Sequence, residues 1–252
     1  MGGEASTAHL ILPVLIAFVS GMMNSVAGGG SFLSFPALVF SGVPPISANA
    51  TNNAAMWVGT IGSARGYRED IRAHRSLLRA IAIVSALGAL LGAILLLATP
   101  ETTFVRLIPW LLLFATIVFA ASPLLARPPQ AAPRHAPWQI AAQFGVAIYG
   151  GYFGAGVGIV MLALLSFSGL PNFNAQNGIK NVLAVVINGV ALLPFVAARI
   201  VDWRFAIPMA VMALLGGYCG ARIFRRLPQA IARAIVVAIG VTMTVVFFAR
   251  SA

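Results

Sequence analysis

The stretch AIAIVSALGALLGAILLLATP, residues 80–100, contains no charged side chain and is apolar through almost its whole length. A helix needs about 20 apolar residues to cross a bilayer, so this stretch is long enough to span one. Other stretches without Asp, Glu, Lys or Arg cover residues 5–64, 107–126, 135–179, 181–198, 205–221 and 234–249. Because these apolar runs are continuous and do not alternate with a period of two, they predict helices and not the strands of a barrel.

The composition agrees with a membrane protein. Of the 252 residues, 60% are hydrophobic and only 8% are charged, whereas soluble domains carry roughly a quarter of charged residues. This excludes a soluble enzyme, and the apolar content excludes a disordered chain. The net charge of +11 does not indicate nucleic acid, because the basic residues lie in short gaps between apolar runs, where they orient helices. We therefore expect the lipid bilayer as a partner, and no nucleic acid.

The order of the runs predicts an all-α polytopic membrane protein built from two repeats. Each repeat holds about four to five hydrophobic segments: residues 1–126 form the N-terminal repeat, 127–136 a Pro-rich linker, and 137–252 the C-terminal repeat. The halves match in the positions of glycines and prolines that interrupt the apolar runs. Gly42-Val43-Pro44 aligns with Gly169-Leu170-Pro171, and Gly88 and Gly92 align with Gly216 and Gly220. Internal repeats are typical of transporters. The alternative is that membrane helices resemble one another in any case.

The loop charges predict how the repeats are oriented. Arginines cluster in the loop Arg65–Arg79, in the linker and in the connection Arg222–Arg233, and the positive-inside tendency places these regions in the cytoplasm. The first loop follows the third run of its half, whereas the last follows the fourth run. Corresponding loops of the two halves thus differ in whether they are rich in positive charge, which places them on opposite sides of the membrane and favours inverted repeats. Arg199 and Arg204 count against inversion, since they would then lie outside.

Glycine runs interrupt the first apolar run of each half. Three glycines follow Asn24 closely in the first half, and alternate glycines stand at the equivalent place in the second. Glycine weakens a helix, and a broken or re-entrant helix exposes backbone N–H groups that bind anions. The alternative is close helix packing through small residues. The substrate-binding residues expected here are Asn24, Gly28, Gly29, Gly30, Ser31, Gly154 and Gly156.

The third run of each half begins with a dense group of amides and hydroxyls. Such groups inside a membrane must find partners or bind something, and neutral donors suit an oxyanion. The alternative is helix capping, with Ser47 or Asn174 as the cap. The substrate-binding residues expected from these heads are Asn49, Thr51, Asn52, Asn53, Asn177, Lys180 and Asn181.

Lys180 is the most informative single candidate for substrate binding, because it is the only lysine of the chain and has no acidic neighbour in sequence. An unpaired ammonium inside a membrane helix is costly, and an anionic substrate would offset that cost. The alternative is a lysine that snorkels to the interface.

The remaining ionisable residues carry no catalytic chemistry. Glu4, Glu69, Asp70, Glu101 and Asp202 all fall at the ends of segments, and so do the three histidines, His9, His74 and His135. The sequence therefore offers no catalytic pair and no carboxylate relay. It offers no metal cluster and no nucleotide motif either. We expect a protein that is not an enzyme and that needs no metal or other cofactor.

The motifs together resemble the TauE/SafE family of sulfite exporters and related permeases. The resemblance rests on NSVAGGGSFLSFPAL, residues 24–38, on GVPPISANATN, residues 42–52, and on VDWR, residues 201–204. It covers nearly the whole chain and includes the two-half layout. The halves diverge where Thr51 aligns with Gly178 and Asn53 with Lys180. The resemblance implies transport of a small sulfur-containing or organic anion, such as sulfite or a sulfonate.

The function expected from the sequence is therefore a secondary transporter of small anions in the bacterial inner membrane. One repeat would move against the other to give alternating access to a site between them. The alternative from another class is a small-anion channel, which would use the same anion-binding dipoles. The oligomeric state stays open, a homodimer included.

Overall fold

The computed structural model describes residues 2–26, 28–65, 75–125, 137–168, 170, 173–223 and 229–251. These residues form ten α-helices and contain no strand, so the all-α prediction is confirmed for the described part of the chain. The first half holds α1 (Gly2–Val26), α2 (Ser31–Phe40), α3 (Pro45–Arg65), α5 (Arg75–Ala98) and α6 (Glu101–Leu125). The second half holds α7 (Pro137–Tyr152), α8 (Val157–Leu165), α9 (Phe173–Ala197), α10 (Trp203–Ile223) and α11 (Gln229–Ser251).

Some of the predicted features lie outside the described residues. The Pro-rich linker 127–136 is one of them, and the division into two repeat domains on either side of it stays a prediction. Most of the basic loop between α3 and α5 is another, together with most of the connection between α10 and α11.

Three helices are long and apolar enough to cross a membrane, among the residues that the structure describes. The windows that qualify are Ile81–Ala98 in α5, Glu101–Val118 in α6 and Ala175–Ala197 in α9. Large apolar side chains also cover the outer surface; Ile83, for example, is 65% exposed and Leu193 is 68% exposed. An apolar exterior around a polar interior is the arrangement that a lipid environment requires.

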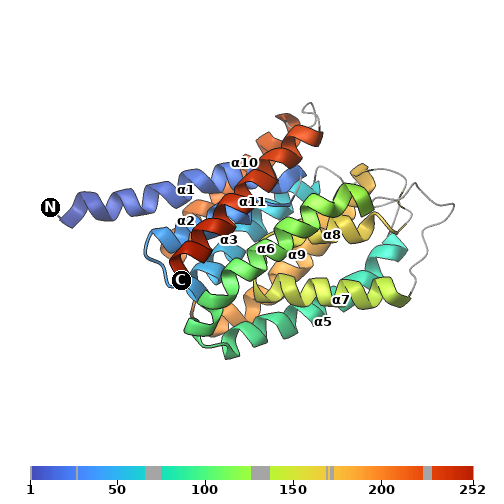
Figure 1. Cartoon of the computed structure of the whole chain (residues 1–252), viewed down its shortest axis with the longest axis horizontal. Coiled ribbons are helices and arrows are strands. Elements are labelled where there is room, and N and C mark those ends of the chain that lie inside the picture. Colours follow the sequence, from blue (N-terminus) through green and yellow to red (C-terminus); the bar gives the residue numbers. More distant parts are fainter. Residues whose placement is uncertain are drawn as a thin grey trace.

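The helices pack in two layers. Six of them form one row, in the order α1, α10, α3, α9, α5, α7, in which each helix contacts the next. The other four, α2, α11, α6 and α8, form a second row on it, and Figure 1 shows α11 and α6 in front of α3 and α9. The helices of the two halves correspond in order: α1 to α7, α2 to α8, α3 to α9, α5 to α10 and α6 to α11. Exchanging every helix for its counterpart reverses each row and leaves the same helices in contact. The counterparts α3 and α9 meet at the centre of one row, and α6 and α11 meet at the centre of the other.

The two central pairs run antiparallel. Asn53 of α3 contacts Asn188 of α9, and Trp57, one turn later in α3, donates to the carbonyl oxygen of Val185, which comes earlier in α9. In the second row, the Trp110 ring of α6 packs against Phe248 of α11. Thr116, later in α6, meets Gly240, which is earlier in α11.

The matched glycines of the two halves have the same packing role. A Cβ atom on Gly92 of α5 would collide with the carbonyl oxygen of Ile148 in α7. A Cβ atom on Gly220 of α10, its counterpart in the second half, would lie 2.6 Å from the Cα atom of Met22 in α1. Glycine is required at both places because two helix backbones come close together.

Candidate functional site

Both glycine runs lie between two helices. The first follows the end of α1 at Val26, where Gly28 has φ 77°, and precedes α2. The second lies between α7 and α8, where Gly154 has φ 73° and Gly156 has φ 76°. Backbone of this left-handed kind favours glycine, which has no Cβ atom to collide with the chain.

The two connections touch each other inside the molecule. A Cβ atom built on Gly28 would lie 2.8 Å from the Cα atom of Gly158, in the first turn of α8. Two segments that are far apart in sequence thus approach backbone to backbone. Only glycine permits this distance, because real Cβ contacts are longer.

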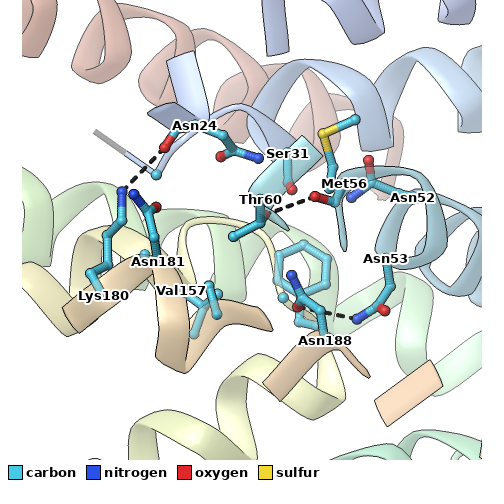
Figure 2. Close-up of a pocket in the computed structure, with 15 residues that line it drawn as sticks. Asn24, Ser31, Asn52, Asn53, Met56, Thr60, Val157, Lys180, Asn181 and Asn188 are labelled. Atoms are coloured by element: carbon cyan, nitrogen blue, oxygen red, sulfur yellow. Dashed lines mark hydrogen bonds between the residues drawn. The ribbon is translucent and has the colours of Figure 1, made fainter. Parts of the chain in front are cut away.

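A cavity of about 30 Å³ lies beside this contact, which is room for about two water molecules. Its lining comes from α1, α2, α3, α8 and α9 and from the two glycine connections. Figure 2 labels ten of the side chains that line it. The residues predicted from the sequence that line it are Asn24, Gly28, Ser31, Asn52, Asn53, Gly154, Lys180 and Asn181. The cavity therefore brings together the glycine runs and the polar heads of both halves.

The polar groups around the cavity are amides, hydroxyls and one ammonium. Within the part of the chain that the structure describes, no carboxylate lines it, and no group of three His, Cys, Asp or Glu could hold a metal ion. Such a lining offers hydrogen-bond donors and one positive charge, which together suit an oxyanion.

Lys180 reaches into the molecule from the first half of α9. Its side chain is 1% exposed, and its Nζ atom donates to the backbone carbonyl oxygen of Asn24 at 3.1 Å. Figure 2 shows the ammonium directed at the end of α1. A snorkelling lysine would run outward along the surface, so this geometry favours the interior role that the sequence suggests.

Two buried amide atoms at the cavity have no hydrogen-bond partner among the described residues. They are Nδ2 of Asn181, next to Lys180, and Oδ1 of Asn53, at the other end. The Nδ2 atom of Asn53 donates to Oδ1 of Asn188 at 3.3 Å. A buried polar atom without a partner costs about 1–3 kcal/mol, and a bound ligand removes that cost.

Two other amides at the cavity are held by the protein itself. Oδ1 of Asn24 accepts the backbone N–H of Gly30 at 2.9 Å, which ties the end of α1 to the start of α2. Oδ1 of Asn52 accepts the hydroxyl of Ser34 at 2.6 Å. These two hydrogen bonds use the amide oxygens, and the donors of an amide lie on its NH₂ group.

Six of the predicted site residues do not line the cavity: Gly29, Gly30, Asn49, Thr51, Gly156 and Asn177. Two of these are tied to the second half of the chain. Asn49 donates to the carbonyl oxygen of Tyr152 at 3.1 Å, and the Thr51 hydroxyl accepts the N–H of Asp202 at 2.9 Å. Ser47, which the alternative interpretation made a helix cap, donates to the carbonyl oxygen of Ile200 at 2.7 Å. Part of the polar head of α3 thus anchors this helix against its neighbours.

The other residues outside the cavity have separate surroundings. A Cβ atom on Gly156 would lie 2.9 Å from the Phe32 ring, so this glycine makes room for α2. The Oδ1 atom of Asn177 is buried without a hydrogen-bond partner in the described part of the chain, and this residue does not belong to the cavity lining.

Seven lining residues were not predicted: Met56, Thr60, Phe153, Val157, Gly158, Ala184 and Asn188. Four of them follow a helical period that the sequence does contain. Asn53, Met56 and Thr60 stand at i, i+3 and i+7 in α3, and Asn181, Ala184 and Asn188 repeat this spacing in α9. Residues so spaced share one face of a helix, and extending the polar heads along that face would have found them.

Comparison with known proteins places the chain among membrane transporters. The sequence model of the sulfite exporter TauE/SafE family matches residues 13–247. The chain is 28% identical over 220 residues to the probable membrane transporter protein ORF9 of Sinorhizobium sp, covering 85% of this chain and 83% of the relative. It is 26% identical over 240 residues to the probable membrane transporter protein YfcA of Escherichia coli K12, covering 93% and 88%. No solved structure matches the chain.

Proposed function

The chain belongs to the sulfite exporter TauE/SafE family and is a membrane transporter, not an enzyme, and from that premise we propose that it moves a small oxyanion, such as sulfite or a sulfonate, by alternating access. One observation carries the choice of an anion: the ammonium of Lys180 is buried at a cavity whose described lining contains no carboxylate. A buried positive charge with only a neutral carbonyl for a partner leaves most of its desolvation cost uncompensated. An anion in the cavity would supply the missing charge.

The neighbouring donors fit the same ligand. The unpaired Nδ2 atom of Asn181 is adjacent to Lys180 in sequence, and both residues line the cavity. Charge-assisted hydrogen bonds to an oxyanion are stronger than neutral ones. Small anions with several oxygen atoms can accept from the ammonium and from the amides together.

The packing supports two inverted repeats as the moving parts. The rows of helices are unchanged on exchange of the halves, and the central pairs α3 with α9 and α6 with α11 run antiparallel. Equivalent helices run antiparallel when the axis that relates the repeats lies in the membrane plane. The glycine connections, one from each half, would act as the broken helices of such a transporter, and the cavity lies between them. We also place the protein in a bacterial inner membrane, since the relatives it matches come from bacteria.

The test uses purified protein in liposomes with labelled sulfite and a panel of sulfonates. A transporter saturates and shows counterflow, in which an excess of unlabelled anion inside accelerates entry of label, whereas the alternative, a channel, shows neither. Lys180→Met keeps the apolar bulk and removes the charge. It should weaken anion binding by about 1.5–3 kcal/mol, the worth of a charged hydrogen bond.

Arg106→Met is the matched control, because Arg106 is an exposed basic residue of α6 that does not line the cavity. This variant should bind the anion as the parent does. Equal binding by Lys180→Met and the parent, on folded protein, would remove Lys180 from the site. Flux of none of the tested anions by the parent would refute the proposed function itself.

A further inference from the structure

The contact between Lys180 and α1 uses a helix end that is chemically a cation site. The last carbonyl groups of a helix have no partner within it and form the negative end of its dipole. In transporters with discontinuous helices, such carbonyls coordinate the coupling ion. Here α1 ends at Val26, beside the cavity, and one of its last carbonyls receives an ammonium from the other half of the chain.

Three carbonyl groups near the end of α1 have a donor besides the ordinary bonds of the helix. The carbonyl oxygen of Met22 accepts the hydroxyl of Ser25 at 2.7 Å, and that of Met23 accepts the N–H of Gly28 at 3.3 Å. The carbonyl oxygen of Asn24 accepts Nζ of Lys180 at 3.1 Å. The ammonium is thus the only one of these three donors that carries a charge.

The surroundings leave no compensation for a second cation. Among the described residues no carboxylate lines the cavity, and the ammonium is buried beside it. Two like charges about 4 Å apart repel by about 4 kcal/mol even at an effective dielectric constant of 20. A Cβ atom on Gly158 would lie 3.4 Å from Cδ of Lys180, so the lysine stem already occupies the space between the two glycine connections.

We infer that the Lys180 ammonium is the resident cation of this transporter, occupying the helix-end position that a sodium ion would otherwise take, so that the anion moves without a coupling sodium ion. This rests on the proposed function, since it concerns how the anion site is neutralised. The Lys180 side chain would then supply the positive charge at the anion site that a bound sodium ion would otherwise supply. The unpaired Nδ2 atom of Asn181 beside it marks where the anion meets that charge.

The experiment measures initial uptake of labelled sulfite into liposomes, with the membrane potential fixed by potassium and valinomycin. Sodium on both sides is replaced by N-methyl-D-glucamine. The parent should transport at the same rate within about twofold. A tenfold loss on removing sodium, in a parent that otherwise shows saturable flux, would overturn the inference while leaving the proposed function intact.

A variant arm tests the ammonium directly. Lys180→Ala should lower the rate by about tenfold or more, the range for a lost charged hydrogen bond, and ammonium or methylammonium at millimolar concentrations should restore several-fold of it by entering the vacated space. Arg106→Ala is the control: it should transport at the parental rate, and added amine should not change that rate. Parental flux by Lys180→Ala, or a folded variant that small amines do not rescue, would also overturn the inference. If Lys180→Ala does not fold, the sodium test on the parent decides alone.

Discussion

A methyl group added at Gly28 should damage this protein more than the same change at Gly42, and the structure says by how much. Both glycines have left-handed backbone, with φ 77° and φ 87°. Both alanine variants therefore incur backbone strain of about 1–2 kcal/mol. They differ in space: nothing lies within 4 Å of a Cβ atom on Gly42, whereas a Cβ atom on Gly28 would lie 2.8 Å from Cα of Gly158.

The collision has a calculable size. Carbon atoms in contact settle at about 3.5–4.0 Å, so the two glycine connections must separate by roughly 1 Å. Overpacking of this kind costs about 1–3 kcal/mol, which gives a total of about 2–5 kcal/mol for Gly28→Ala against about 1–2 kcal/mol for Gly42→Ala. A shift of about 1 Å is also enough to break the 3.1 Å hydrogen bond between Lys180 and Asn24, because such bonds weaken beyond about 3.2 Å.

The assay pairs thermal unfolding in detergent with sulfite uptake in liposomes. Gly28→Ala should unfold at a lower temperature than Gly42→Ala and should transport at a small fraction of the parental rate. Gly42→Ala should keep most of its transport. Equal unfolding temperatures for the two variants, or parental transport by Gly28→Ala, would refute the idea that the contact between Gly28 and Gly158 holds the site together.

Two other predictions concern topology and pH. Single cysteines at Arg72 and Arg225, in a Cys219→Ser background, should both be protected from an impermeant reagent added outside, and labelling of only one would overturn the inverted-repeat assignment. Asp202 receives hydrogen bonds from the Arg204 side chain, which hold the pKa of its carboxyl group below the usual range. A depressed pKa contributes stability that is present above the unfolded-state pKa of about 3.9 and is lost as pH falls through the folded-state value. Asp202→Asn should therefore weaken the loss of stability on acidification, slightly because Arg204 is exposed, and an unchanged acid profile would contradict this.

The helices were predictable from the sequence, because charged residues, glycines and prolines mark where the apolar runs begin and end. The charge-free stretch 80–100 covers most of α5 (Arg75–Ala98), and the stretch 107–126 covers most of α6 (Glu101–Leu125). A membrane helix depends mainly on its own composition, so local sequence is enough to find it. Tertiary contacts are needed only to decide which face it turns inward.

The site was predictable only in part, because polar residues at a helix start have two possible uses that look alike in sequence. Asn52 and Asn53 line the cavity, whereas Asn49 and Thr51 anchor α3 to Tyr152 and Asp202. Those partners lie more than 100 residues away along the chain, and no local pattern specifies them. Asn188 could have been predicted from local sequence, because it lies seven residues after Asn181 on the same helix face. It was missed because the helical period was not extended beyond the polar head.

If the protein is the anion transporter that we propose, the divergence between the halves would let a nearly symmetric arrangement of helices bind one anion in one orientation. In the alignment of the repeats, Lys180 takes the place of Asn53. At one end of the cavity Lys180 and Asn181 present a charge and a free amide donor, and at the other end Asn53 pairs with Asn188. Two identical halves would instead offer two equal ends. Two lysines so close together would repel each other, and two asparagines would leave an anion uncompensated. A single lysine avoids both costs, so the place where the repeats differ most in chemistry is also where the anion is expected to bind.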